Sequence, residues 1–309
     1  MGKMPIQFYL SSQQRAEMER AWYRFRMSQV SQAQNKPAHI ILTVPRTGSN
    51  LLIWCLNRLP KTFFFYEPLN ESVKGLVSPS LTGEPCLEEL ARLSQIPRCP
   101  ISGFKIMFSQ LANRKISVGQ VAEKFPHAKY IVLFRRDLLM TYISLQLANQ
   151  TGQWLLFRRH QREKARIEFR PDDYLYFCQR VMQFYREILE QSSITQSALF
   201  VEYETFSQNR VPFFKETLCP FLGVEFKDCW VGLERQATYH CPSEAVSNPE
   251  AIRPHLQSAE RYLDWIPTSL SPNKTVPKET FEPGGKPPLQ NLRRWNTEVL
   301  RPPVLSPES

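Results

Sequence analysis

The residues best suited to chemistry in this chain form a short polar turn, Pro45-Arg46-Thr47-Gly48-Ser49-Asn50, which we call the cradle. It offers one fixed cation at Arg46, a flexible glycine at Gly48, and hydroxyl or amide groups at Thr47, Ser49 and Asn50. The helically spaced apolar residues that follow predict a helix starting at Ser49 or Asn50. Because free N–H groups and the helix dipole favour an anion there, the cradle is a candidate phosphate site.

The cradle differs from the loop of nucleotide-hydrolysing proteins, G-x-x-x-x-G-K-[ST], in which Lys precedes the hydroxyl that holds magnesium. Here Ser49 follows Gly48 directly, and the cation Arg46 lies two residues before the glycine. This arrangement suits a terminal 5′-phosphate better than a triphosphate. The alternative is a strand, turn and helix with no ligand at the turn, and the turn alone does not decide between the two.

A second polar group follows an apolar run at residues 129–134. Arg136 lies at the end of this predicted strand, Asp137 can cap the next helix, and Ser144 lies eight residues after Arg136. Arg136 and Ser144 could contact one anion if the ligand lies across the first turns of that helix. The alternative interpretation is a surface arginine pair and a solvated serine.

Two further candidates lie at the ends of predicted strands. Glu67 follows the aromatic run at residues 62–66, which Pro68 ends, and Lys105 lies near the end of the run at residues 101–107. In an open α/β sheet, ligands bind at the carboxyl ends of the strands. Glu67 and Lys105 are therefore expected at the edge of the sheet where a ligand would bind.

The elements that must position these residues alternate between strands and helices. A continuous apolar run at residues 39–44 predicts a strand buried on both faces of a parallel sheet. We expect further strands at residues 62–66, 101–107, 129–134 and 199–201, and helices at residues 87–93, 117–125, 138–148 and 172–191. This order predicts an α/β fold of three layers, P-loop-like, with a mostly parallel central sheet flanked by helices.

The composition is that of a globular protein of 309 residues, with 39 Lys and Arg against 29 Asp and Glu. The resulting net charge of +10 suggests anionic ligands or partners. Seven scattered cysteines show neither C-x-x-C pairs nor a metal-type histidine spacing, so we expect reduced thiols and no metal. A basic run at residues 158–166 is interpreted as a solvated helix face, with an acceptor-side patch as the alternative.

Three segments are expected along the chain. Residues 1–36 form an N-terminal helical segment, residues 37–267 the main domain, and residues 268–309 a Pro-rich tail that is extended or disordered. The first segment has no apolar run of the length of a signal peptide or membrane span, so a cytoplasmic protein is expected. Contact with a membrane surface and the oligomeric state are left open.

The cradle and the Arg136 and Ser144 pair together resemble the sulfotransferase family that uses 3′-phosphoadenosine 5′-phosphosulfate (PAPS). Four stretches are similar to its carbohydrate-type branch and to the bacterial glycolipid and nodulation-type enzymes: PRTGSNLL, FFFYEPL, GFKIMFSQL and RRDLLMTYISLQLA. The residues Glu202-Tyr203-Glu204 match a later family stretch. The resemblance covers residues 37–260 and implies sulfuryl transfer to a hydroxyl acceptor, a carbohydrate or glycolipid.

The resemblance also implies roles for single residues. Arg46, Thr47, Gly48, Ser49 and Asn50 would hold the 5′-phosphate and the sulfuryl oxygens. Lys105 is expected to contact the sulfuryl group because of its position at the end of its strand. Arg136 and Ser144 would hold the 3′-phosphate, Tyr203 would lie near the adenine, and Glu67 would be the general base. A C-terminal R-K-G-x-x-G segment found in the cytosolic branch is missing here, which leaves Arg235 and Arg253 as candidates to complete the 3′-phosphate site.

Two other classes of function are kept as alternatives. A P-loop-like nucleotide kinase would share the architecture, although it needs the Lys and hydroxyl pair that this cradle lacks. A non-enzymatic protein that binds anions or nucleic acid would account for the positive charge. The charge is spread along the chain, however, and no aromatic-rich basic platform accompanies it, so we expect no nucleic-acid partner.

Overall fold

The structure, a computed structural model, describes residues 36–71, 76–95, 99–154, 165–227, 239, 241–256 and 262–267. In these ranges a five-stranded sheet has the order β2-β3-β1-β4-β5, and every neighbouring pair of strands is parallel. The strands are β1 (His39–Thr43), β2 (Thr62–Phe65), β3 (Ile101–Met107), β4 (Lys129–Phe134) and β5 (Ala198–Glu202). The strand β1 is therefore central, with β3 on one side and β4 on the other.

Helices connect the strands. Before β5 they are α2 (Ser49–Leu56), α3 (Gly83–Ser94), α4 (Phe108–Asn113), α5 (Val118–Lys124), α6 (Leu138–Thr151), α7 (Pro171–Glu190) and α8 (Ser192–Thr195). After β5 they are α9 (Tyr203–Gln208), α10 (Arg210–Phe213), η3 (Phe214–Leu218), α11 (Cys219–Leu222), η4 (Pro242–Ala245), α12 (Pro249–Ile252) and η5 (Arg253–His255).

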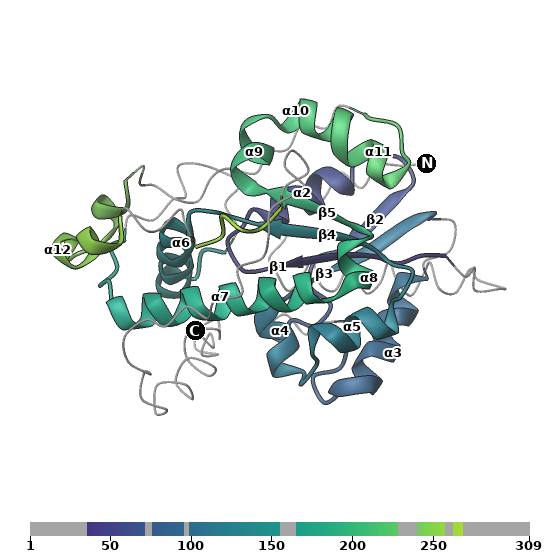
Figure 1. Cartoon of the computed structure of the whole chain (residues 1–309), viewed down its shortest axis with the longest axis horizontal. Helices are drawn as coiled ribbons and strands as arrows, with labels where there is room; N and C mark the ends of the chain where they lie inside the picture. Colours follow the sequence, from purple (N-terminus) through teal and green to yellow (C-terminus); the bar gives the residue numbers. More distant parts are fainter. Residues whose placement is uncertain are drawn as a thin grey trace, which may run out of the picture.

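The helices cover both faces of the sheet (Figure 1). One face packs against α2 and α9 to α11, and the other packs against α3 to α5, α7 and α8. Successive residues of β1 point to opposite faces: Ile40 and Leu42 join one apolar cluster, and Ile41 joins the other. All five residues of β1 are buried, which accounts for the continuous apolar run. The expected three-layer α/β fold with a parallel central sheet is confirmed.

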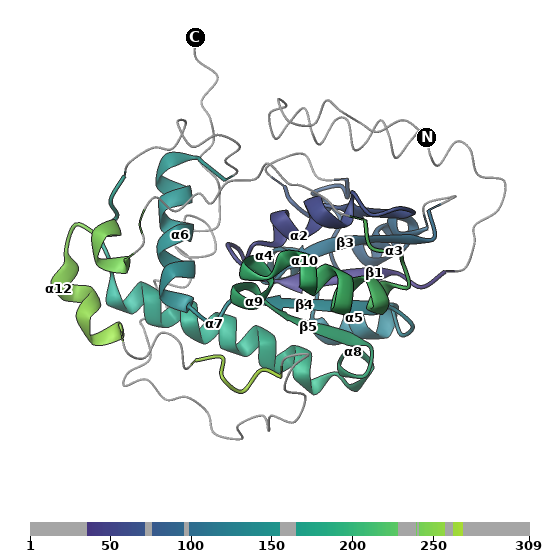
Figure 2. The same cartoon turned by 90° about the horizontal axis from the view of Figure 1, so that it is seen from above.

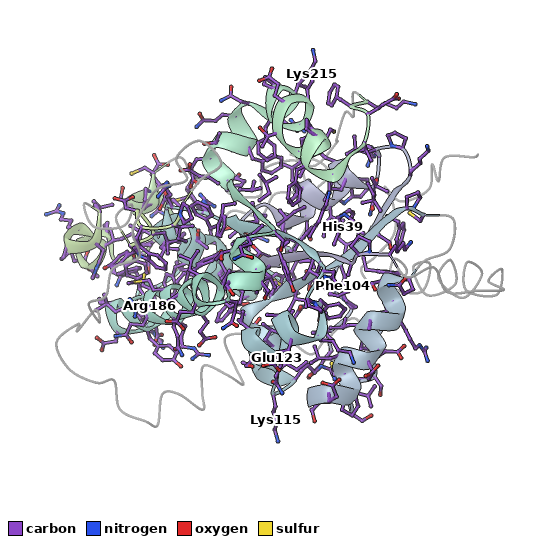
Figure 3. All side chains as sticks on the ribbon, turned by 45° about the vertical axis from the view of Figure 1, so that its right-hand side comes forward. His39, Phe104, Lys115, Glu123, Arg186 and Lys215 are labelled. Atoms are coloured by element: carbon purple, nitrogen blue, oxygen red, sulfur yellow. The ribbon has the colours of Figure 1, made fainter. Side chains whose placement is uncertain are left out.

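The side chains follow the same layering (Figure 3). Lys115 and Lys215 point outward on opposite sides of the molecule, whereas His39 and Phe104 lie buried on the sheet between them. Seen from above, α6 stands beyond one edge of the sheet, beside α12 (Figure 2). Because α6 follows the end of β4, this is the edge formed by the carboxyl ends of the strands.

Most predicted elements occur close to their expected positions. The strands at 101–107 and 129–134 have the predicted bounds, and the helix after the cradle begins at Ser49. The predicted helix at 87–93 begins earlier, at Gly83, and the helices α4 and α9 to α11 were not predicted. Nearly all of the predicted N-terminal helical segment at 1–36, nearly all of the basic run at 158–166, and the tail at 268–309 lie outside the described residues.

Candidate active site

The cradle joins β1 to α2 and contains two residues with left-handed backbone. Gly48, the residue before α2, has φ 79°, and Arg46 has φ 67°. A Cβ atom on Gly48 would lie 2.5 Å from Cδ2 of Tyr203. Gly48 is therefore required on two counts, because only glycine adopts this φ without strain and because the Tyr203 ring occupies the space of a side chain.

Two buried threonines fix the inner side of the cradle. The hydroxyls of Thr43 and Thr47 are hydrogen-bonded at 2.6 Å. Thr47 Oγ1 also lies 3.0 Å from the carbonyl oxygen of Val44, and Thr43 Oγ1 lies 2.8 Å from the carbonyl oxygen of Leu133 on β4. The Thr47 side chain thus holds the turn against the sheet, so its contribution to a ligand would come through its backbone.

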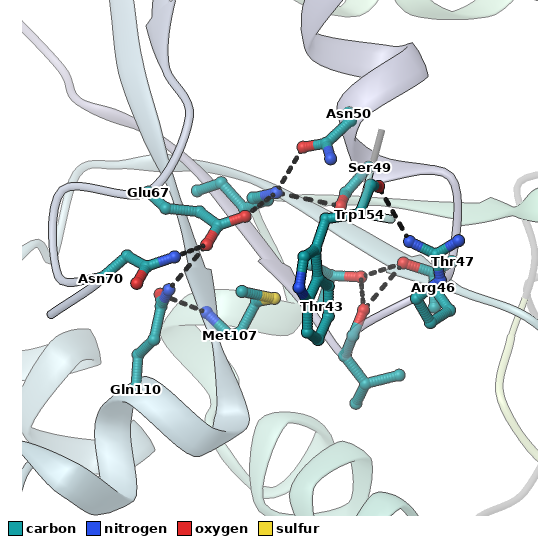
Figure 4. Close-up of polar contacts among 12 residues, drawn as sticks. Thr43, Arg46, Thr47, Ser49, Asn50, Glu67, Asn70, Met107, Gln110 and Trp154 are labelled. Atoms are coloured by element: carbon teal, nitrogen blue, oxygen red, sulfur yellow. Dashed lines mark hydrogen bonds and ion pairs between the residues drawn. The ribbon is translucent and has the colours of Figure 1, made fainter. Parts of the chain in front are cut away.

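Lys105 links the cradle to Glu67 (Figure 4). Its side chain lies on β3 and is 1% exposed, and its Nζ atom is 2.8 Å from Glu67 Oε1. The same ammonium donates to Asn50 Oδ1 at 2.8 Å and to Ser49 Oγ at 3.2 Å. Because β3 is the neighbour of β1, the carboxyl ends of these two strands bring one cation to the start of α2.

Glu67 is held on its second oxygen as well. Its Oε2 atom accepts hydrogen bonds from Asn70 Nδ2 at 2.5 Å and from Gln110 Nε2 at 3.3 Å. Gln110 is itself oriented by the backbone N–H of Met107, which donates to its Oε1 atom at 3.1 Å. The Glu67 side chain remains 18% exposed, so the carboxylate is fixed in position and still accessible from outside.

Arg46 forms a second set of contacts on the other side of the cradle. Its Nε atom donates to Ser144 Oγ on α6, and one terminal nitrogen donates to the main-chain carbonyl of Trp154, both at 3.0 Å. Burial, together with the neighbouring Arg135 cation, lowers the pKa of the Arg46 guanidinium to about 10, and Tyr203 opposes the change. Two close guanidinium groups make this side of the cradle favourable for an anion.

Arg135 follows β4 and is buried. Its guanidinium carbon lies 4.9 Å from the centre of the Tyr203 ring, which in turn packs on Gly48. Its Nε atom is 3.7 Å from Oε1 of Glu204. Burial raises the pKa of the Glu204 carboxyl, an effect opposed by Arg135 and by the N–H groups of Arg136 and Asp137.

Arg136 takes part in a different set of contacts. Its Nε atom is 2.5 Å from Glu202 Oε1, and a terminal nitrogen lies 3.3 Å from Asp264 Oδ1 and donates to the carbonyl of Leu263 at 3.0 Å. Ser144, its predicted partner at the 3′-phosphate, contacts Arg46 instead. The roles of Arg136 and Ser144 in binding a 3′-phosphate stay predictions.

The structure brings most of the predicted site residues to one edge of the sheet. The cradle, Lys105 and Glu67 are joined by direct contacts. Ser144 is connected to them through Arg46, and Tyr203 packs on Gly48. Arg253 lies exposed in η5, and Arg235 is outside the described residues.

Sequence reasoning missed several polar residues around the site: Arg135, Thr43, Asn70, Gln110 and Trp154. Arg135 could have been predicted, because it is adjacent to Arg136 at the end of the same strand. Trp154 had none, because its contact with Arg46 spans 108 positions and depends on where α6 ends.

Within the described ranges, no group of three or more His, Cys, Asp or Glu residues is arranged to hold a metal ion. In the same ranges, no helix combines the length and the apolar character needed to cross a membrane.

Comparison with known proteins gave matches among solved structures alone. No family model matches the chain, and no curated protein matches it. The chain is similar to a sulfotransferase from Alicyclobacillus acidocaldarius, with a TM-score of 0.45 and 13% identity over 68% of this chain and 89% of that one. It is also similar to the sulfotransferase domain of the Synechococcus PCC 7002 olefin synthase, with a TM-score of 0.37 and 18% identity over 64% and 77%.

A mouse sulfotransferase complexed with PAP has a TM-score of 0.41 and 13% identity, over 64% of this chain and 62% of that one. These matches compare the backbone alone, and they assign no role to any single residue of this chain.

Proposed function

We propose that this protein transfers the sulfuryl group of PAPS to a hydroxyl group, on a carbohydrate or glycolipid acceptor. The observation that carries the proposal is the contact of Lys105 with both the start of α2 and the Glu67 carboxylate. It links a site for an anion to a fixed, accessible base. The resemblance of the cradle and of the Arg136 stretch to sulfotransferase motifs names the anion as the phosphosulfate of PAPS.

The proposed reaction is a direct displacement at sulfur. The acceptor oxygen forms a bond to sulfur while the bond from sulfur to the 5′-phosphate oxygen breaks, and that phosphate leaves with the electron pair. The proton of the acceptor hydroxyl passes to Glu67. As in phosphoryl transfer, charge gathers on the oxygens around the transferred group and on the leaving oxygen, so positioned cations and N–H groups supply much of the rate.

Each residue of the site then has a distinct task. Arg46 and the N–H groups at the start of α2 stabilise the leaving 5′-phosphate, together with Gly48, Ser49 and Asn50. Lys105 contacts the sulfuryl group. Thr47 keeps the turn in place from its buried side. No step needs a metal ion.

The nucleotide's other end would lie toward the start of α6. Tyr203, which packs on Gly48, is proposed to lie near the adenine, and Arg136 with Ser144 to hold the 3′-phosphate. Arg136 has carboxylate partners in Glu202 and Asp264, so a phosphate would have to compete with them or add to them.

The test is transfer of labelled sulfate from PAPS into a panel of glycans, glycolipids, tyrosyl peptides and small phenols. We expect incorporation into a glycan or glycolipid, with inhibition by added 3′,5′-ADP because the product occupies the PAPS site. Incorporation into phenols or peptides alone would contradict the acceptor class. Mg²⁺-dependent binding of ATP without binding of 3′,5′-ADP would replace the proposal with a nucleotide kinase.

A further inference from the structure

Trp154 combines two features that the proposed reaction has not used. It lies two positions after Gly152, the residue that ends α6, and its main-chain carbonyl accepts the 3.0 Å hydrogen bond from Arg46. Its indole Nε1 atom is buried and has no hydrogen-bond partner within the described part of the chain. The residue is thus fixed to the cradle by its backbone while its one side-chain donor is unused.

An unused buried donor indicates a missing acceptor. Burying an N–H group without a partner costs free energy, so most such groups in proteins are paired. The indole nitrogen donates and does not accept, and a partner must therefore supply an oxygen or another acceptor. The apolar part of the ring packs against the apolar cluster that contains Ile40 and Leu42, and this packing fixes the direction of the N–H group.

Figure 4 shows where this donor lies. In this view the indole stands between Glu67 on one side and Arg46 and Thr47 on the other, with its nitrogen on the side of Glu67. In the proposed displacement, the leaving phosphate is held by Arg46 and the attacking hydroxyl by Glu67. The sulfur lies between these two, and its remaining oxygens project to the side of the line that joins them.

We propose that Trp154 Nε1 donates a hydrogen bond to an oxygen of the sulfuryl group during its transfer. This inference rests on the proposed function, and it adds a neutral donor to the charged donors Arg46 and Lys105. It also assigns Trp154 two roles, since its carbonyl positions the Arg46 guanidinium and its indole contacts the substrate. The bond strengthens as charge gathers on the sulfuryl oxygens, so its main effect is on turnover.

The experiment compares wild-type protein with Trp154→Phe, which removes the N–H group and keeps an aromatic ring. Calorimetry with PAPS and with 3′,5′-ADP separates the sulfuryl contact from the rest of the nucleotide, because only PAPS carries the sulfuryl group. We expect about tenfold weaker binding of PAPS and unchanged binding of 3′,5′-ADP. Turnover should fall by about 10²-fold.

The matched control is Trp54→Phe, which removes an indole from α2. This indole is buried in the apolar cluster that contains Ile41, and it lies beneath Arg58. This variant should keep the wild-type ratio of the two affinities and near-wild-type turnover. Equal loss of both nucleotides in Trp154→Phe would make Trp154 a structural support of Arg46 and overturn the inference. An effect confined to the KM of the acceptor would also overturn it.

The failures of the two proposals are distinguishable. If wild-type protein binds neither PAPS nor 3′,5′-ADP, the proposed function fails. If wild-type protein binds both and Trp154→Phe binds and turns over PAPS equally well, the inference alone fails.

Discussion

At the scale of residues, the Glu67 carboxylate combines an observed structural role with a proposed catalytic one. Its 2.8 Å contact with Lys105 orders the cradle, and its exposed edge can accept a proton. A carboxylate with three donors around it, Lys105, Asn70 and Gln110, remains in one orientation without a ligand. The structural and the catalytic roles therefore have to be separated by substitution.

Glu67→Gln separates them because glutamine keeps the size and much of the hydrogen bonding of glutamate but cannot take the acceptor proton. We expect turnover to fall by about 10²–10⁴-fold, with the affinity for 3′,5′-ADP nearly unchanged. Steady-state kinetics and calorimetry on the same preparation measure both. Loss of nucleotide binding would favour a purely structural role, and near-normal turnover would move the role of base to another residue.

Gly48→Ala tests the close approach of Tyr203 to the cradle. The substitution places a Cβ atom 2.5 Å from the Tyr203 ring and forces alanine to φ 79°, so we expect lower thermal stability and much weaker binding of 3′,5′-ADP. Gly152→Ala is the control, since Gly152 has φ 69° with nothing within 4 Å of the added atom. It shares the backbone strain, and it should leave nucleotide affinity unchanged. Equal affinity in both variants would show that the contact of Gly48 with Tyr203 is irrelevant to the site.

At the scale of elements, the sequence predicted the strands and helices that depend on a local pattern of apolar and polar residues. The apolar run at residues 39–44 and the cradle that follows it were enough to predict β1, the start of α2 and the candidate anion site. The short pieces between 203 and 222 were missed, since α10 and α11 have four residues each and a π-helical segment lies between them. The contacts of Gln110 and Trp154 were missed because they join distant parts of the chain, and no local pattern records them.

The pairing of β1 with β3 depends on Gly103. A Cβ atom at this position would lie 1.8 Å from the carbonyl oxygen of His39, so Gly103→Ala should push the two central strands apart. We expect a loss of about 1–3 kcal/mol or more in unfolding free energy, measured by denaturant titration. Gly119→Ala in α5 is the control, because its added atom meets ordinary contacts at 3.7 Å, and alanine there should stabilise by about 0.5–1 kcal/mol. Equal stability of the two variants would contradict the close approach.

His39 should make the stability of the sheet depend on pH. Burial, together with the cations Lys129 and Lys36, lowers its pKa to about 4, and a hydrogen bond with the backbone of Ser102 opposes the change. The unfolded chain takes up the proton near pH 6.5, and the folded protein takes it up only near pH 4. Stability is therefore lost as pH falls through this window, by about 2 kcal/mol between pH 7.5 and 5.

Denaturant titration at several pH values measures this loss. In His39→Gln the loss should be smaller, whereas in His127→Gln, which changes an exposed histidine, it should match that of the wild-type protein. An unchanged pH dependence in His39→Gln would contradict the assignment.

At the scale of the whole molecule, the order of the strands creates the site. The chain leaves β1 on one side to form β2 and β3 and crosses to the other side for β4 and β5. The carboxyl end of β1 is therefore open between two neighbours, which is where ligands bind in parallel sheets. Lys105 reaches the opening from β3 and Arg135 from the end of β4, so cations from both sides face the cradle. The proposed anionic substrate would account for part of the net charge of +10.

Calorimetric titration with 3′,5′-ADP and 5′-AMP, on wild-type protein and on Arg136→Ala, tests the central claim most directly. The account predicts that wild-type protein binds 3′,5′-ADP without added Mg²⁺ and more tightly than 5′-AMP. Arg136→Ala should weaken 3′,5′-ADP by about ten- to a hundredfold and 5′-AMP far less, because only the former has a 3′-phosphate. Failure of the wild-type protein to bind 3′,5′-ADP, or its preference for ATP with Mg²⁺, would contradict the account.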